Sequence, residues 1–81
     1  MALSPSDRDI LDFERTWWTQ PGSKQRAIRE QLGISGTRYY QRLNRLLDEP
    51  HALAYDPLTV KRGRRLREQR RRGRIEGRRA K

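Results

Sequence analysis

The sequence predicts an all-α protein: a small helix-turn-helix core of three helices, followed by a basic C-terminal helix and tail. Apolar residues recur at intervals of three or four, which places them on one face of a helix. Capping residues, often followed by proline, mark where the expected helices begin. No segment shows the alternation of apolar and polar residues that is typical of a half-buried strand.

The first helix is expected to begin after Ser4. Ser4 suits the capping position, Pro5 suits the first helical position, and Asp7 completes a capping box. The apolar face of this helix comprises Ile10, Phe13, Trp17 and Trp18. The string Gln20-Pro21-Gly22 interrupts helical structure, so the helix should end near Thr19.

Two further helices should flank a tight turn. Ser23 is placed to cap a helix that ends near Leu32, and Ser35 to cap a helix over residues 36–48. Gly33 can take the positive φ that ends the earlier helix. The residues expected to face inward are Ala27, Ile28 and Leu32 in the earlier helix and Tyr39, Leu43, Leu46 and Leu47 in the later one.

Two more prolines mark the starts of later helices. Residues 51–55 should form one helical turn after Pro50. The pair Asp56-Pro57 should start another helix by the same combination of cap and proline. Three apolar residues of this last helix are expected to pack back on the body: Leu58, Val60 and Leu66.

The end of the chain has few apolar residues. Beyond about Arg70 we expect disorder until a partner binds, because Gly73 and Gly77 weaken helix further. The sequence therefore divides into a helix-turn-helix domain, residues 1–56, and an arginine-rich C-terminal helix and tail, residues 57–81.

The apolar residues around Gly33 follow the spacing of bacterial helix-turn-helix domains. The matching residues are Ile28, Leu32, Ile34, Tyr39 and Leu43. Arg29 is a departure, because small residues usually fill its position so that the two helices can approach. Either the helices cross at a wider spacing or the Arg29 side chain extends outward. The pattern indicates a DNA-binding domain, and a generic three-helix bundle is the alternative.

The helix over residues 36–48 should present a polar face. At about 100° per residue, its inward leucines leave Thr37, Arg38, Gln41 and Arg45 pointing outward and Arg42 at the edge. Arginine can bind guanine through two hydrogen bonds, and glutamine can pair with adenine. Ser35 lies at the helix start, where bases and phosphates are contacted, and the Tyr40 hydroxyl should reach a phosphate from the rim. A solvated polar surface is the alternative.

The net charge lies at the C-terminal end. Residues 61–81 hold 12 Lys and Arg against two acids, a net charge of +10, whereas residues 1–60 are neutral. Such a block of arginine is suited to neutralising nucleic acid phosphates. The residues predicted to bind phosphates, or to enter the minor groove through Arg-Gly-Arg strings, are Lys61, Arg62, Arg64, Arg65, Arg67, Arg70, Arg71, Arg72 and Arg74. Arginine-rich segments that fold on RNA are equally permitted.

Trp17 and Trp18 are neighbouring aromatic residues that are able to stack on bases. A core role is the simpler interpretation, because a body of about 60 residues buries only roughly 60% of its unfolded surface and needs large apolar side chains. Trp18 is expected to be half exposed.

The composition excludes several classes of protein. There is no cysteine and a single histidine, His51, so neither disulfides nor a histidine-rich metal site is expected. No apolar run reaches the roughly 20 residues that span a bilayer, and no signal peptide is visible. No set of residues suggests an enzyme or a cofactor site. We expect a cytoplasmic, nucleoid-associated protein.

The strings Phe-Glu-x-x-Trp-Trp from Phe13 and Thr-Arg-Tyr-Tyr-Gln from Thr37, with Asp56-Pro57-x-x-Val60 later in the chain, carry a resemblance. The chain resembles a family of small, helix-turn-helix-like actinobacterial proteins that is catalogued as a domain of unknown function. The resemblance covers nearly the whole chain and implies an actinobacterial or phage source. It implies little about activity.

The sequence thus predicts a non-enzymatic protein that binds double-stranded DNA, as a transcriptional regulator or a nucleoid-associated protein. The helix over 36–48 would enter the major groove, either with weak specificity or as part of a homodimer. One alternative is an RNA- or ribosome-associated factor anchored by the arginine-rich tail. Another is an adaptor that binds RNA polymerase through the Trp17/Trp18 face.

Overall fold

The computed structural model describes residues 3–17 and 22–79, with side chains described as far as residue 73. Its helices are α1 (Pro5–Thr16), α2 (Lys24–Leu32), α3 (Gly36–Leu46), α4 (Pro50–Tyr55) and α5 (Pro57–Arg79). No strand occurs in these ranges. The prediction of an all-α protein is confirmed.

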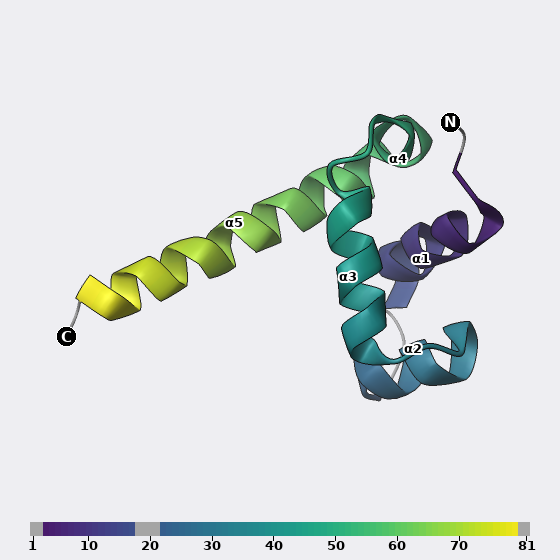
Figure 1. Ribbon diagram of the computed structural model, residues 1–81, viewed down its shortest axis with the longest axis horizontal. Helices are drawn as coiled ribbons and strands as arrows, with labels where there is room; N and C mark the ends of the chain where they lie inside the picture. The colour runs from purple at the N-terminus through teal and green to yellow at the C-terminus, as the bar shows by residue number, and fades with distance from the viewer. Residues whose placement is uncertain (1–2, 18–21, 80–81) are drawn as a thin grey trace.

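The helices form a body with one long projection (Figure 1). α1, α2 and α3 pack together, with α2 near one end of α3 and α4 near the other. α5 begins against α1 and α4 and then runs away from the body, which gives the molecule extents of 44 × 30 × 21 Å. None of the described helices is both long enough and apolar enough to cross a membrane.

Side-chain caps begin the first three helices as predicted. Ser4 accepts a hydrogen bond of 3.0 Å from the backbone N–H of Asp7, whose carboxylate accepts one of 3.3 Å from Ser4 N–H. Ser23 and Ser35 accept from the N–H groups three residues later, at 3.4 and 3.2 Å. These bonds satisfy N–H groups that have no partner inside the helix. Asp56 likewise accepts from the N–H of Thr59 at 3.2 Å.

The turn between α2 and α3 depends on Gly33. Its φ of 69° lies in the left-handed region, and its N–H donates to the carbonyl of Arg29 at 3.1 Å. A residue with a Cβ would be strained there. The Arg29 side chain is exposed, so it extends outward. α3 ends at Leu46, two residues before the predicted end, because the N–H of Asp48 bonds three residues back to Arg45.

The buried core joins all five helices. It comprises Ile10, Leu11, Phe13, Ile28, Tyr39, Leu43, Leu46, Leu47, Ala52 and Val60. Ala27 and Leu32 are partly buried against it, so the predicted inward residues of α2 and α3 are confirmed. Val60 is buried as predicted, but the predictions for Leu58 and Leu66 are wrong, because their side chains are 80% and 41% exposed. The turn that buries Thr59 and Val60 leaves Leu58 on the opposite side of α5.

The C-terminal segment differs from the prediction. α5 continues as a helix to Arg79, whereas the sequence predicts disorder beyond Arg70 until a partner binds. The helix is anchored on the body at its start, and Glu68 lies 3.9 and 3.8 Å from Arg71 and Arg72 one turn later. Such pairs support a helix. The predicted domain boundary after residue 56 stays a prediction. α5 begins at Pro57, next to this boundary, but its residue Val60 belongs to the core of the body.

The end of the first helix lies partly outside the described residues. α1 ends at Thr16, with Trp17 as its cap residue. The predicted end near Thr19, and the predicted exposure of Trp18, fall in the segment 18–21, which lies outside the described residues.

Candidate nucleic-acid interface

A buried carboxylate fixes how α3 sits on α1. Glu14 is 6% exposed, and its Oε1 accepts a hydrogen bond of 2.6 Å from the hydroxyl of Tyr39. Lys24 Nζ of α2 lies 2.7 Å from the same oxygen and 3.1 Å from Oε2. Burial, and then the Glu14 carboxylate, raise the pKa of Tyr39 far above its usual range, so the hydroxyl remains a donor. One residue of α1 therefore binds both α2 and α3.

Aromatic rings enclose the Lys24 ammonium. Its Nζ lies 4.5 Å from the ring centroid of Trp17 and 5.1 Å from that of Tyr40. Tyr40 also packs edge-on against Tyr39, with centroids 5.2 Å apart. Tyr40 is thus half-buried at the rim of the core, as predicted.

The polar face of α3 is exposed as the periodicity predicts. Thr37, Arg38, Gln41 and Arg45 are exposed, and Ser35 is exposed while it caps the helix. Ile34, Arg38, Gln41, Arg42 and Arg45 line a shallow hollow. Arg42 is partly buried, and its Nη2 lies 3.7 Å from Asp7 of α1. Arg42 therefore lies at the edge of the face, as expected.

Three of the arginines that are predicted to bind phosphates contact the body of the protein. Arg62 Nη2 donates to the backbone carbonyl of Glu14 at 2.7 Å. Arg64 Nε donates to the carbonyl of Leu47 at 2.6 Å. These carbonyls lie at the C-terminal ends of α1 and α3, where carbonyl groups have no hydrogen-bond partner inside the helix. The first turns of α5 are therefore held to α1 and to the end of α3.

The third of these arginines, Arg67, forms a bidentate pair with Asp48. Its Nη2 and Nη1 lie 2.9 and 3.1 Å from the two carboxylate oxygens, and Nη1 also donates to Asn44 Oδ1 at 2.9 Å. The hydrogen bond to Arg67 lowers the pKa of Asp48, and the same bond raises the pKa of Arg67. This pair joins α5 to the C-terminal end of α3.

Gly63 marks the closest approach of α5 to α3. A Cβ at this position would lie 2.6 Å from Cδ2 of Leu47, closer than packed side chains allow. Leu47 is 4% exposed and belongs to the core. The absent side chain at Gly63 therefore lets the two helices meet, and beyond this point they diverge (Figure 1).

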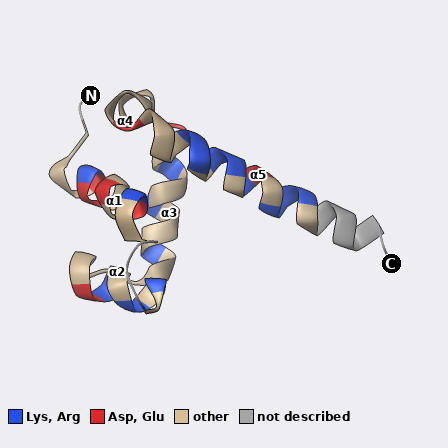
Figure 2. Ribbon diagram, turned by 180° about the vertical axis from the view of Figure 1, so that it is seen from behind, with Lys and Arg blue, Asp and Glu red and all other residues tan. Residues whose placement is uncertain are grey.

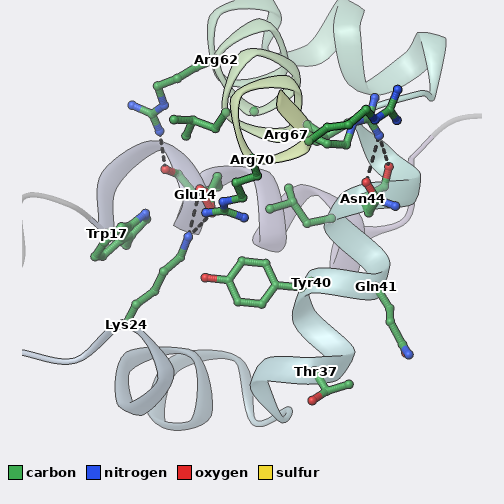
Figure 3. A pocket seen from close by; sticks show the side chains of 15 residues that line it. Glu14, Trp17, Lys24, Thr37, Tyr40, Gln41, Asn44, Arg62, Arg67 and Arg70 are labelled. Atoms are coloured by element: carbon green, nitrogen blue, oxygen red, sulfur yellow. Dashed lines mark hydrogen bonds and ion pairs between the residues drawn. The ribbon is translucent and has the colours of Figure 1, made fainter. Parts of the chain in front are cut away.

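The divergence leaves an open groove of about 980 Å³, which we call the α3–α5 groove (Figure 3). Its lining is Glu14, Trp17, Lys24, Thr37, Tyr40, Gln41, Leu43, Asn44, Leu47, Arg62, Gly63, Leu66, Arg67, Arg70 and Arg71. Arg62, Arg67 and Arg70 lie on the α5 side, and Tyr40 and Thr37 on the α3 side. Thr37 and Gln41 of α3 therefore share one concave surface with Arg70 and Arg71 of α5. The sequence alone assigns these two pairs to separate parts of the chain.

The other predicted phosphate-binding residues lie elsewhere on α5. Lys61, Arg65 and Arg72 are exposed and are absent from the groove lining. The side chain of Arg74 lies outside the described part of the chain. Basic residues follow α5 outward from the body, whereas acidic residues concentrate on α1 (Figure 2).

Sequence reasoning missed Glu14 and Lys24. Glu14 follows Ile10 by four residues and precedes Trp17 by three, so it lies on the apolar face of α1. A charged residue at such a position signals a buried partner.

A family model matches residues 2–75 of the chain. The chain belongs to the DUF3263 family. The family is described as a protein of unknown function, which agrees with the resemblance to a domain of unknown function. Neither a curated protein nor a solved structure matches the chain.

Proposed function

We propose that this DUF3263 protein is a non-enzymatic binder of double-stranded DNA, with α3 in the major groove and α5 along the sugar-phosphate backbone. The observation that carries the proposal is the composition of the α3–α5 groove. It combines residues that can contact bases, Thr37 and Gln41, with cations that can contact phosphates, Arg70 and Arg71. A duplex seated against α3 would meet both sets at once.

α3 has the chemistry of a base-contacting helix. Arg38, Gln41 and Arg45 are exposed side by side on it. Arginine binds guanine O6 and N7 through two hydrogen bonds, and glutamine matches adenine. The network around Glu14 fixes the angle at which α3 would enter the groove of the duplex.

The basic residues of α5 have two different roles in this proposal. Arg62, Arg64 and Arg67 are positioning residues, because they bind the carbonyls and the carboxylate that hold α5 on the body. The residues that would neutralise phosphates lie further along or on the outer side: Lys61, Arg65, Arg70, Arg71 and Arg72. A regulator of transcription and a nucleoid-associated protein in the cytoplasm would both use such a surface.

Fluorescence anisotropy with a labelled duplex, measured from 50 to 200 mM salt, tests the proposal. The variant Arg70→Gln/Arg71→Gln should weaken binding similarly for every duplex sequence. It should also reduce the slope of log K against log salt by about two, since each phosphate contact contributes roughly one. Arg26→Gln/Arg29→Gln is the matched control, because it also removes two charges and both arginines are exposed on α2, outside the groove lining.

The control variant should bind the duplex as the wild type does. Equal losses of affinity for the control variant and for the groove variant would mean that DNA binding depends on overall charge rather than on this surface. The proposal would then be wrong.

A further inference from the structure

The α3–α5 groove has an apolar floor that duplex DNA does not require. Trp17, Tyr40 and Leu66 contribute to its lining together with the core residues Leu43 and Leu47. Leu66 is 41% exposed, and it lies on the groove side of a cationic helix. Phosphates are contacted by cations, N–H groups and hydroxyls such as that of Tyr40, so the aliphatic side chains and rings of this floor have no role in holding a DNA backbone.

The rim of the groove also carries a net positive charge. Lys24 and Arg67 of its lining are paired with Glu14 and Asp48. The lining further includes Arg62, Arg70 and Arg71. The Glu14 carboxylate is already bound by Lys24 and by the Tyr39 hydroxyl. An occupant that matches this surface is therefore apolar along its centre and anionic along its edges.

We infer that the α3–α5 groove also binds an acidic amphipathic helix of a protein partner. On the groove side of α5, lining residues recur every four positions, at Arg62, Leu66 and Arg70. They form a straight wall about 12 Å long, at about 1.5 Å per residue. α3 supplies the opposite wall, and the contact of Gly63 with Leu47 closes one end. A third helix of about three turns would bury Leu66 between these walls, as amphipathic helices do in other apolar grooves.

Such a partner would compete with DNA. It would cover Thr37 and Gln41 on α3 and Arg70 and Arg71 on α5, the residues proposed to contact the duplex. The acidic helix would thus act as a mimic of the phosphate backbone and release the protein from DNA. This competition rests on the proposed function, whereas the binding of the acidic helix does not.

A synthetic peptide of about four helical turns serves as the probe. It carries leucines on one face, at spacings of three and four, and glutamates on both flanks. The control peptide has the same composition with the leucines distributed around the helix. By anisotropy with the full chain, the amphipathic peptide should bind about tenfold more tightly than the control, a difference that burial of one leucine side chain is enough to give.

The variant Leu66→Ser separates this site from the DNA interface. Leu66 is not among the residues proposed to contact DNA, so the variant should keep the duplex affinity and helix content of the wild type while it loses the preference for the amphipathic peptide. Equal binding of the two peptides by the wild type would overturn the inference, because charge alone would then explain the attraction. An unchanged preference in Leu66→Ser would overturn it as well.

Two further measurements separate the other outcomes. If the chain binds duplex DNA and the amphipathic peptide together, without displacement, the competition is wrong. If the chain alone forms a dimer in sedimentation, and Leu66→Ser abolishes it, the occupant is a second copy and the inference of a protein partner is overturned. Absence of DNA binding would contradict the proposed function, and the peptide titration would still decide the inference.

Discussion

The hydroxyl of Tyr39 donates a hydrogen bond of 2.6 Å to the carboxylate of Glu14 inside the core. These residues lie 25 positions apart, and Lys24 of α2 binds the same carboxylate. Three helices are thereby joined through one buried anion whose hydrogen-bonding atoms have partners. The orientation of α3, and with it the proposed DNA-binding face, depends on this network.

Replacing the Glu14 carboxylate by an amide should destabilise the protein. Glu14→Gln removes the negative charge that pairs with the Lys24 ammonium and places a donor NH2 group where a carboxylate oxygen accepts, which should lower the free energy of unfolding by roughly 1–3 kcal/mol. Urea unfolding followed by circular dichroism measures the change. Asp9→Asn on the exposed side of α1 removes the same charge and should change the free energy by about 0.5 kcal/mol or less. Similar losses in both variants would show that the network contributes no stability of its own.

Gly63 and Gly73 of α5 should respond differently to alanine. Gly63→Ala forces a methyl group against Leu47, and we expect a loss of up to roughly 2 kcal/mol when the helix-propensity gain of about 1 kcal/mol is subtracted from an overpacking cost of about 1–3 kcal/mol. A loss of this size lowers the Tm by several degrees, at about 4–8 °C per kcal/mol. Gly73→Ala meets no atom within 4 Å and should not lower the Tm. A rise in Tm for Gly63→Ala would contradict the close approach of α5 to α3.

The attachment of α5 to α3 should weaken in acid. The hydrogen bond from Arg67 lowers the pKa of Asp48 below its usual value in the folded state. The pair therefore contributes stability above pH of about 4, the usual carboxyl value, and loses it as the pH falls through the folded pKa. Asp48→Asn should be less stable than the wild type at pH 6, and the difference should shrink as the pH falls below about 4. A difference that is independent of pH would mean that the carboxylate charge is irrelevant to this contact.

Substitutions on α3 should change sequence preference rather than salt dependence. Arg38→Ala and Gln41→Ala should each reduce discrimination between preferred and altered duplexes by about 1–3 kcal/mol. The preferred duplex is first selected from a random-sequence pool, and binding is then measured at one salt concentration. Arg29→Ala on the exposed side of α2 is the control and should leave discrimination unchanged. If the α3 variants discriminate between duplexes as well as the wild type does, α3 does not contact the bases.

Local chemistry explains why most helix starts could be predicted. The caps at Ser4, Ser23 and Ser35 each bond to an N–H three residues later, so the signal and the structure lie within one turn. The inward face of α3 followed from periodicity, because its leucines and Tyr39 recur at helical spacing.

The roles of the arginines in α5 could not be predicted in this way. Arg62 donates to a carbonyl 48 residues earlier in the chain, and no local pattern distinguishes it from Arg65. The α3–α5 groove could not be predicted either, because it depends on how α5 crosses the end of α3 at Gly63. The length of α5 also could not be predicted, because the glycines and the lack of apolar residues near its end indicate weak helix propensity.

The most direct test of the central claim is a comparison of duplex DNA with structured RNA. Anisotropy titrations of the full chain would be run on both nucleic acids at 50 and 200 mM salt. The account predicts tighter binding to the duplex, with an affinity that falls by roughly 10³ to 10⁵ between the two salt concentrations if six to ten phosphates are neutralised. Tighter binding to RNA, or a duplex affinity that does not change with salt, would contradict it.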